Sequence, residues 1–406
     1  MKILQINKYH YIKGGSDRVY FNTGDLLSAR GHDVKYFSTL HSLNINNSDS
    51  EFFVPAVENR NAGFIQKALN TRNYLYDKDV KRNLDRLIDI FRPDIAHLHL
   101  FYGGLSASVL KSLREKGIPV VHTVHDYRML CPANSFLDSE NKICERCRNR
   151  YYFQCTLRRC MDDNLFYSAM LSFEAYMRKY KINPLNYIDH FIFVSRFARD
   201  KHIEFNSRYE SKSSHLYNFT GFTTDKIIDG SGKTFLYYGR LSKEKGLGTL
   251  LDAAARLKID LTIAGTGPLQ NLVIDYSSRN KNIRFVGFKS GNELIELITN
   301  TSFIIVPSEW YENNPMTVIE AYALGKPVIG SRIGGIPEIV RDSETGFLFE
   351  PGNSDDLIQI IARASGIQNG DYLKMAENAR KFASEFFSPE IHYNKLISIY
   401  HSLAGR

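Results

Sequence analysis

The chain has 406 residues, of which 43% are hydrophobic and 24% are charged, and its net charge is +8. This composition is typical of a soluble globular protein, and no apolar run approaches the ~20 residues of a membrane-spanning helix. The length exceeds what one core usually supports and predicts two domains of about 200 residues each. The first residues, MKILQINKYHYIKGG, lack the pattern of a secretory signal, so we expect a cytoplasmic protein.

The basic excess lies in the first half of the chain. Residues 1–217 hold 32 Lys and Arg against 23 Asp and Glu, whereas residues 218–406 hold 20 against 21. The excess is greatest in KICERCRNRYYFQCTLRRC, residues 142–160. Nucleic acid, anionic lipid and a phosphorylated substrate are all partners for such a segment, and a solvated basic loop is the alternative.

Short apolar runs alternate with amphipathic segments along the chain, which predicts parallel α/β sheets covered on both faces. The first half has strand candidates at 2–6, 33–38, 94–100, 119–125, 190–195 and 213–218, with crossover helices such as 17–30 and 104–116. The second half has strand candidates at 234–239, 260–265, 283–288, 302–307 and 326–331. The polar segment 219–233 between them is the predicted linker. Two such sheets leave a cleft that faces the carboxyl ends of their strands.

The first glycine turn, Lys13-Gly14-Gly15, follows the strand at 2–6 and precedes the helix at 17–30. Two glycines permit a positive φ and a close approach of the backbone to a ligand at the start of a helix. A plain turn between strand and helix explains the same residues equally well.

The next polar candidates lie in and after the strands of the first half. Asp77-Lys78-Asp79 has the D-x-D spacing of metal-dependent sugar transferases, but it lies in a helical pattern, so we expect a solvated helix face. His97 and His99 share one strand face without a carboxylate beside them, which favours a structural role over a metal site. His122 is expected in the core, whereas His125 ends its strand and is the catalytic candidate.

All five cysteines lie within residues 131–160, and the last four, Cys144, Cys147, Cys155 and Cys160, have the spacing C-x2-C-x7-C-x4-C. Paired thiolates can hold a structural Zn²⁺ in a tetrahedral site. Reduced thiols in a basic loop are the alternative, and disulfides are less expected in a cytosolic chain.

Two further glycine turns follow strands in the second half. In GRLSKEKG, residues 239–246, Arg240 and Lys245 emerge at a strand end beside a helix start, which suits a diphosphate. AGTGP, residues 264–268, lacks the third glycine of G-x-G-x-x-G, so a nicotinamide-type dinucleotide site is not expected.

The segment EWYENNPMTVIE, residues 309–320, sets two glutamates around a helix start. Asn314 is a favoured N-cap and Pro315 a favoured first residue, so we expect a helix from Pro315 that stops at Gly325. Glu312 then lies just before the helix, and Glu320 lies in its second turn. A terminal helix is expected over 386–406.

These motifs together resemble the retaining glycosyltransferases of family 4. GRLSKEKG, AGTGP, the glutamates of E-x7-E and GGIPE follow one another in that family's order, and KGG, RGHDV and HDYRMLCP agree with its N-terminal half. The HDYRMLCP variant with a downstream C-x2-C is similar to the branch that builds capsular, O-antigen or exopolysaccharide chains. The resemblance spans roughly residues 2–405 and implies the GT-B fold: α/β, with two facing Rossmann-like domains, parallel sheets and an interdomain cleft. The expected domains are 1–217 for the acceptor and 218–385 for the donor, with the helix of 386–406 packing back toward the first.

The resemblance implies a role for each matching residue. Arg240 and Lys245 match the pair that clamps the donor diphosphate, Glu312 faces the donor sugar, and Glu320 binds the ribose. The remaining implied positions are the helix start at Asn314, Pro315, Met316 and Thr317, the phosphate glycine Gly15, the active-site His125, and Phe288 with Lys289 beside the nucleobase. Asn313-Asn314 departs from the small residues that many members of the family carry at these positions, so the resemblance does not imply which sugar the donor carries.

The implied reaction moves a sugar from a UDP- or GDP-sugar to a glycan or a polyprenyl-diphosphate-linked acceptor, with retention of configuration. Arg240, Lys245 and the helix start can stabilise the leaving group, so we expect no catalytic metal and no cofactor. A nucleotide-sugar epimerase of similar fold and a non-catalytic basic binding protein are the alternatives. The basic half favours an anionic membrane surface, on the inner face of the cell membrane, over nucleic acid.

Overall fold

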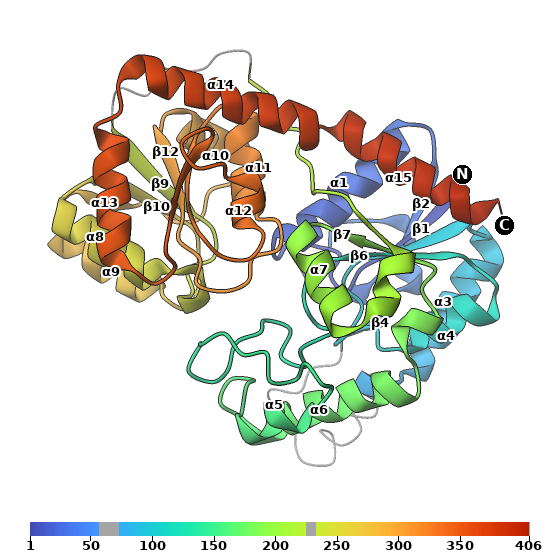
Figure 1. Cartoon of the computed structure of the whole chain (residues 1–406). Coiled ribbons are helices and arrows are strands. Elements are labelled where there is room, and N and C mark those ends of the chain that lie inside the picture. Colours follow the sequence, from blue (N-terminus) through green and yellow to red (C-terminus); the bar gives the residue numbers. More distant parts are fainter. Residues whose placement is uncertain (57–72, 225–232, 406) are drawn as a thin grey trace. The chain divides into compact units, whose positions relative to one another are not determined.

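The computed structural model describes residues 1–56, 73–224 and 233–405, and Figure 1 shows their helices and strands. The chain divides into two compact units. Unit 1 comprises Met1–Leu216 and the residues from Tyr393 onward, and unit 2 comprises Tyr217–His392. The predicted linker, 219–233, lies partly outside the described residues.

Unit 1 is built on a six-stranded parallel sheet in the order β2-β1-β5-β6-β7-β8. Its strands are β1 (Lys2–Ile6), β2 (Asp33–Phe37), β5 (Ile95–Leu98), β6 (Val120–Val124), β7 (His190–Phe193) and β8 (Ser213–His215). Register is regular, with Ile3 opposite Val34 on one side and Ile95 on the other. A separate two-stranded sheet pairs β3 (Thr39–Leu40) with β4 (Val54–Pro55). The short β3 and β4 were not predicted.

The helices of unit 1 lie in the connections between these strands, and all but α5 and α6 lie near the sheet (Figure 1). They are α1 (Gly15–Ala29), α3 (Lys78–Phe91), α4 (Ser108–Glu115), α5 (Phe153–Leu157), α6 (Leu165–Tyr180) and α7 (Arg196–Phe205). The terminal helix α15 (Pro389–Ala404) adds Leu396, Tyr400 and Leu403 to a core that contains Ile3, Ile95 and Val121. The last segment of the chain therefore completes the core around its first strand.

Unit 2 repeats the arrangement with a second six-stranded parallel sheet in the order β11-β10-β9-β12-β13-β14. The strands are β9 (Thr234–Tyr238), β10 (Asp260–Ala264), β11 (Ile283–Phe285), β12 (Phe303–Val306), β13 (Val328–Ser331) and β14 (Gly346–Phe349). The helices are α8 (Leu247–Leu257), α9 (Gln270–Arg279), α10 (Gly291–Thr299), α11 (Met316–Ala323), α12 (Ile336–Ile339), α13 (Ser354–Ser365) and α14 (Asn369–Phe386). Strand β14 was missed because its GFLF run is only four residues long.

Alternate residues of β9 face two different cores, as the pleat requires. Helix α14 contributes to both cores, but Phe235 and Tyr237 pack with residues of α8, α9 and α13, whereas Leu236 and Tyr238 pack with residues of α10, α11 and α12. Figure 1 shows these two groups of helices on opposite faces of the sheet. A sheet buried on both faces explains why the strands read as continuous apolar runs.

Across residues 1–56, 73–224 and 233–405, no helix is both long enough and apolar enough to cross a bilayer.

Unit 1 buries several histidines in their neutral form. Burial lowers the pKa of His122, whose Nδ1 bonds the carbonyl of Leu98, to about 4, and it lowers the pKa of His202 to about 3. His122 is thus the core residue that its place in the strand predicted. Because unfolding returns these rings to a pKa near 6.5, the unfolded state binds more protons and the stability of unit 1 falls as the pH drops below about 6.5.

We therefore expect His202→Phe to weaken the pH dependence of stability. Between pH 7.5 and pH 5 the wild-type protein should lose about 2 kcal/mol through His202 alone, and the variant should lack that loss. Urea unfolding at the two pH values measures the difference. His401→Phe, at an exposed position of α15, is the control and should titrate like the wild type. An unchanged pH dependence in His202→Phe would contradict the assignment.

Candidate functional site

The central strands of unit 2 place the candidate residues. β9 and β12 are neighbours, and the strand order runs outward from them in both directions. In open parallel sheets, ligands bind beyond the carboxyl ends of the strands where the order reverses. The loop after β9 carries Arg240 and Lys245, and the loop after β12 carries Glu312.

Lys245 and Glu312 form a largely buried ion pair. Nζ of Lys245 lies 2.6 Å from Oε1 of Glu312, and the hydroxyl of Ser308 donates to the same oxygen at 2.6 Å. Burial alone would raise the pKa of Glu312, but the charge of Lys245 and these hydrogen bonds outweigh it and hold that pKa below its usual value. Glu312 therefore stays ionised, and it fixes the ammonium group of Lys245, which also lies 5.1 Å from the ring centroid of Trp310.

Two glycines bring the backbones of this ion pair together. Gly246, next to Lys245, has φ +68°, and a Cβ there would lie 1.7 Å from the carbonyl oxygen of Pro307. Gly334 has φ +59°, and a Cβ there would lie 2.4 Å from the carbonyl oxygen of Glu312. The next residue, Gly335, donates its N–H to that oxygen at 2.7 Å. Any side chain at these glycines would separate the loops and strain the backbone.

Helix α11 begins one residue later than predicted. Pro315 is the N-cap residue, with an extended backbone, and Met316 is the first helical residue. The prediction of Asn314 as the cap is wrong because its Oδ1 accepts the backbone N–H of Asn218 at 2.8 Å. The helix start has no side-chain cap, so its first N–H groups stay available. The Nδ2 group of Asn314 is buried, and within the described part of the chain it finds no acceptor. The C-terminal signal is confirmed, since α11 ends at Ala323 and Gly325 has φ +67°.

The first turn of α11 is tied to the end of β9, because the hydroxyl of Tyr238 donates to the carbonyl of Thr317 at 3.0 Å. Glu320 lies in the second turn and is 1% exposed. Arg240, by contrast, is exposed, and so is the ring of Phe288. The structure thus joins Lys245 to Glu312 directly, ties Thr317 to the β9 end, and leaves Arg240 and Phe288 open to solvent.

Unit 1 has the same reversal of strand order, between β1 and β5. Beyond these strands, Nδ1 of His99 lies 2.9 Å from Nε2 of His125, and the two rings stack with centroids 5.2 Å apart. Gln5 Oε1 accepts from Nε2 of His99 at 3.0 Å, which leaves Nδ1 of neutral His99 to accept the Nε2 proton of His125. Both rings line a cavity with an empty volume of about 380 Å³, which also contacts Tyr102 and Arg128.

His99 and Gln5 were missed as site residues. His97 is structural as predicted, because Thr123 at 2.7 Å and Tyr400 at 2.6 Å occupy its two ring nitrogens. His99, on the same strand face, instead contacts the catalytic candidate. The sequence carried the signal for it, since His99 and His125 each follow the end of one of two strands that prove to be neighbours, β5 and β6.

The turn at Gly14-Gly15 differs from the prediction of a positive φ. Gly14 is extended, with φ −163°, and Gly15 opens α1. The turn is held by the carboxylate of Asp17, which accepts the N–H of Gly14 at 3.0 Å and the side-chain amide of Asn7 at 3.0 Å. No atom lies within 4 Å of where a Cβ on Gly14 would stand, so the space beside this helix start is open.

The D-x-D segment is a helix start rather than a solvated helix face. Asp77 is the buried N-cap of α3 and accepts the N–H of Asp79 at 2.8 Å and that of Val80 at 3.3 Å. Lys78 and Asp79 are exposed, and Asp79 pairs with Arg82 at 3.0 Å. The prediction of a solvated face was therefore wrong for Asp77.

The cysteines do not form the predicted zinc site in this structure. All five are free thiols, and Cys147 and Cys155 are buried. Within the described ranges, no three His, Cys, Asp or Glu side chains are arranged to hold a metal ion, and this includes Cys144, Cys147, Cys155 and Cys160. Burial raises the pKa of Cys131 to about 11, so that thiol stays protonated.

Two family models match the chain. Residues 13–219 match the model described as Glycosyltransferase Family 4, and residues 223–382 match the model described as Glycosyl transferases group 1.

Similar proteins agree with these matches. An uncharacterized 42.6 kDa protein in the cps region of Klebsiella pneumoniae is 24% identical, and the match covers 84% of this chain and 88% of that protein. The amylovoran biosynthesis glycosyltransferase AmsK of Erwinia amylovora is 29% identical, and the match covers 42% of this chain and 44% of AmsK. Several such matches span only about half of the relative's length.

Among solved structures, HepE of Anabaena in complex with UDP-glucose is similar with a TM-score of 0.65 and 17% identity, and the match covers 99% of this chain and all of HepE. At this identity the similarity shows the fold. The two sheets described above are the parallel sheets of the GT-B fold.

The Lys245–Glu312 pair yields a stability test. Lys245→Met leaves the Glu312 carboxylate buried without its counter-charge, so we expect a loss of about 3 kcal/mol in the free energy of unfolding at pH 8. The loss should shrink toward pH 5, because the unpaired Glu312 gains a raised pKa and becomes protonated. Urea unfolding of the variant at both pH values measures this.

Lys289→Met is the matched control, because Lys289 pairs with Glu293 at 2.8 Å on the surface. It should cost no more than about 0.5 kcal/mol. The double variant Lys245→Met/Glu312→Gln should recover part of the loss. Equal effects of Lys245→Met and Lys289→Met would refute a buried pair.

Proposed function

The chain belongs to glycosyltransferase family 4, and from that premise we propose that it transfers a sugar from a nucleotide diphosphate sugar with retention of configuration. The proposed acceptor is a glycan or a lipid-linked saccharide in the synthesis of a surface polysaccharide. The relative in the cps region and the amylovoran biosynthesis enzyme AmsK support this process. The complex of HepE with UDP-glucose supports a UDP-sugar as the donor.

The observation that carries this proposal is the Lys245–Glu312 pair beside the uncapped start of α11. When the glycosidic bond of a nucleotide sugar breaks, the diphosphate gains negative charge. Fixed cations and helix N–H groups lower the barrier only if they already point at that charge. Glu312 holds the ammonium group of Lys245 in place, so the site needs no rearrangement of this cation during the reaction.

The other residues of unit 2 follow from the same geometry. Exposed Arg240, at the end of β9, is proposed to hold the diphosphate together with Lys245. The N–H groups of Met316 and Thr317 and the buried amide of Asn314, next to Pro315, are proposed to bind phosphate or sugar oxygens. Buried Glu320 is proposed to bind the ribose hydroxyls, and exposed Phe288 to border the nucleobase.

In unit 1, we assign the contact with the transferred sugar to His125. His99 contacts Nε2 of His125 at 2.9 Å, and the two rings stack, so the His125 ring is held at the wall of the cavity. Gln5 and His99 act as positioning residues because they fix the tautomer and the plane of that ring. The open space beside Gly14, at the start of α1, suits a phosphate near Gly15.

The proposed location is the inner surface of the cell membrane, where lipid-linked acceptors are extended. Unit 1 holds 34 Lys and Arg against 23 Asp and Glu, whereas unit 2 holds 18 against 21, so the basic excess of the chain lies in unit 1. An anionic membrane surface attracts such a charge by about 1 kcal/mol per Lys or Arg near it.

Ligand binding tests the donor proposal. Saturating UDP should raise the thermal midpoint of the protein, because a ligand that binds only the folded state stabilises it. Arg240→Ala should weaken UDP binding about tenfold, whereas Lys243→Ala, an exposed cation in the same loop, should not change it. Glu320→Ala should mainly raise the KM for the donor, and Lys245→Ala should mainly lower kcat. No thermal shift with UDP or GDP and their sugars would refute the proposal, and conversion of donor without any acceptor would identify an epimerase.

The role of His125 has its own test. His125→Ala should lower kcat by at least about 100-fold while the UDP-induced thermal shift remains, because the ring contacts the sugar rather than the nucleotide. His401→Ala, at the exposed end of α15, should keep wild-type activity. Full activity in His125→Ala would remove that residue from the mechanism.

A further inference from the structure

Two helices of unit 1 stand apart from its sheet. The connection from β6 to β7 contains α5 and α6, which pack against each other away from the strands (Figure 1). The basic and cysteine-containing segment leads into α5. The proposed reaction uses no side chain of these two helices.

Helix α6 is apolar on two sides. Met170, Leu171 and Ala175 are buried, as expected for a helix that packs on the rest of its unit. Phe166, Phe173 and Tyr180 are 47%, 53% and 68% exposed, and their spacing of seven residues places them on one side of the helix. Large aromatic side chains in a row along a solvent-exposed helix face are unusual for a soluble surface and mark an interaction site.

Helix α5 packs on α6 and adds exposed apolar side chains of its own. Leu157 is 70% exposed, and Phe153, one helical turn earlier, is 45% exposed. We call the whole set the α5–α6 face; its members are Tyr151, Phe153, Leu157, Leu165, Phe166, Phe173 and Tyr180.

Cations surround the α5–α6 face. Its neighbours in the chain are Arg150, Arg158, Arg159, Lys179 and Lys181. The exposed acids of the same stretch are Asp162 and Asp163, in the turn between the helices. Glu174 is buried, where its carboxylate accepts from Arg178 at 2.6 and 2.7 Å, so it does not offset the surface charge. Arg158 pairs with Asp138 at 4.0 Å, and even with Asp162 and Asp163 the five cations outnumber the exposed acids of this stretch.

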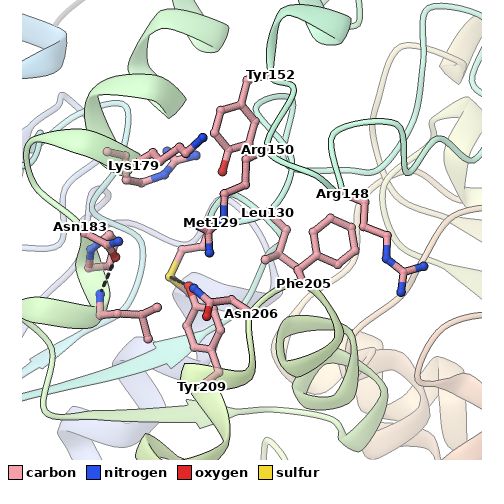
Figure 2. A pocket seen from close by; sticks show the side chains of 13 residues that line it. Met129, Leu130, Arg148, Arg150, Tyr152, Lys179, Asn183, Phe205, Asn206 and Tyr209 are labelled. Carbon is pink, nitrogen blue, oxygen red and sulfur yellow. Dashed lines mark hydrogen bonds between the residues drawn. The ribbon is translucent and has the colours of Figure 1, made fainter.

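A basic cavity borders this face (Figure 2). It has an empty volume of about 480 Å³, open to solvent, and Arg150, Lys179 and Tyr152 contribute to its wall. Nζ of Lys179 lies 4.6 Å from the ring centroid of Tyr180, a member of the α5–α6 face. Tyr152 and Tyr180 both pack on Tyr176, which links the cavity wall to the face.

The charge in this cavity is available to a ligand. Arg148, which also lines the cavity, pairs with Glu204 at 2.7 Å, and Arg178 is occupied by Glu174. Arg150 is half-buried, and no hydrogen bond or ion pair joins its guanidinium to another residue of the described ranges. A guanidinium and an ammonium group beside an apolar surface match a phosphate that is attached to an apolar body.

We propose that the α5–α6 face docks the protein on a bilayer that contains anionic phospholipid. The aromatic and leucine side chains enter the interfacial layer, as the apolar residues of peripheral helices do, and Arg150 and Lys179 bind lipid phosphates at its border. Docking of this kind would bring the enzyme to a lipid-linked acceptor, so this proposal rests on the proposed function.

Sedimentation of the full chain with vesicles tests this. The protein should bind vesicles of phosphatidylcholine with 30% phosphatidylglycerol much more strongly than pure phosphatidylcholine, and 0.5 M NaCl should weaken the binding. Phe173→Glu and Leu157→Glu should each lower the bound fraction at least about fivefold. Ile90→Glu is the matched control, because Ile90 is 68% exposed on α3, and it should bind like the wild type.

Charge reversal separates the phosphate contacts from general attraction. Arg150→Glu/Lys179→Glu should weaken binding to anionic vesicles at least about tenfold. Arg279→Glu/Lys258→Glu, at exposed cations of unit 2, should have less than a twofold effect. Equal losses in the two double variants would refute a defined surface.

Three results would overturn the docking proposal. One is no binding to anionic vesicles. Another is a concentration-dependent dimer, detected by light scattering, that Phe173→Glu dissolves while vesicles remain unbound, which would make a second copy the partner. The third is that the protein does not bind vesicles, while inorganic phosphate raises its thermal midpoint and Arg150→Glu removes that effect. This would make the cavity a site for a soluble phosphate.

The same samples distinguish this proposal from the proposed function. Phe173→Glu and the Arg150/Lys179 variant should keep the UDP-induced thermal shift, because their positions lie outside the residues assigned to the donor. Vesicle binding without any nucleotide-induced shift would leave the docking surface intact and refute the transferase assignment.

Discussion

The ion pair between Lys245 and Glu312 connects the two loops that follow the central strands of unit 2. A buried carboxylate is costly unless a cation and hydrogen-bond donors compensate it, and here Lys245 and Ser308 both contact one oxygen. Gly246 allows the loop after β9 to approach Pro307 at the end of β12, and Gly334, in the loop after β13, allows the backbone there to approach Glu312. The start of α11 follows Glu312 by four residues and is held by the contacts of Asn314 with Asn218 and of Thr317 with Tyr238.

The two units use one topology for two kinds of chemistry. In each, the residues of interest follow strands on either side of the point where the strand order reverses. Unit 2 gathers fixed charge there, which suits a diphosphate. Unit 1 instead gathers groups that hydrogen-bond to one another, with Gln5, His99 and His125 in series. A fold that repeats its scaffold can thus place different chemical groups at the carboxyl ends of separate sheets.

The sequence predicted the strands well because parallel strands buried on both faces are continuous apolar runs, and each predicted run contains a strand of the structure. The sequence alone did not allow contacts between distant segments to be predicted. Asn314 has the chemistry of an N-cap, but Asn218, almost a hundred residues away, takes its side-chain oxygen. His99 has the appearance of a structural histidine until β5 and β6 are known to be neighbours. Asp77 likewise shows that local spacing identifies a helix but not which end of the pattern is its cap.

The terminal helix α15 makes unit 1 discontinuous in the chain, whereas unit 2 is a single segment. Leu396, Tyr400 and Leu403 cover core residues that are synthesised at the very beginning, and Tyr400 also bonds His97 in the histidine row of β5. During translation, unit 2 can therefore fold as soon as it emerges, while the first sheet must wait for the last residues to cover its apolar face. The histidine row is therefore complete only after Tyr400 has been made, 303 residues later in the chain than the His97 ring that it bonds.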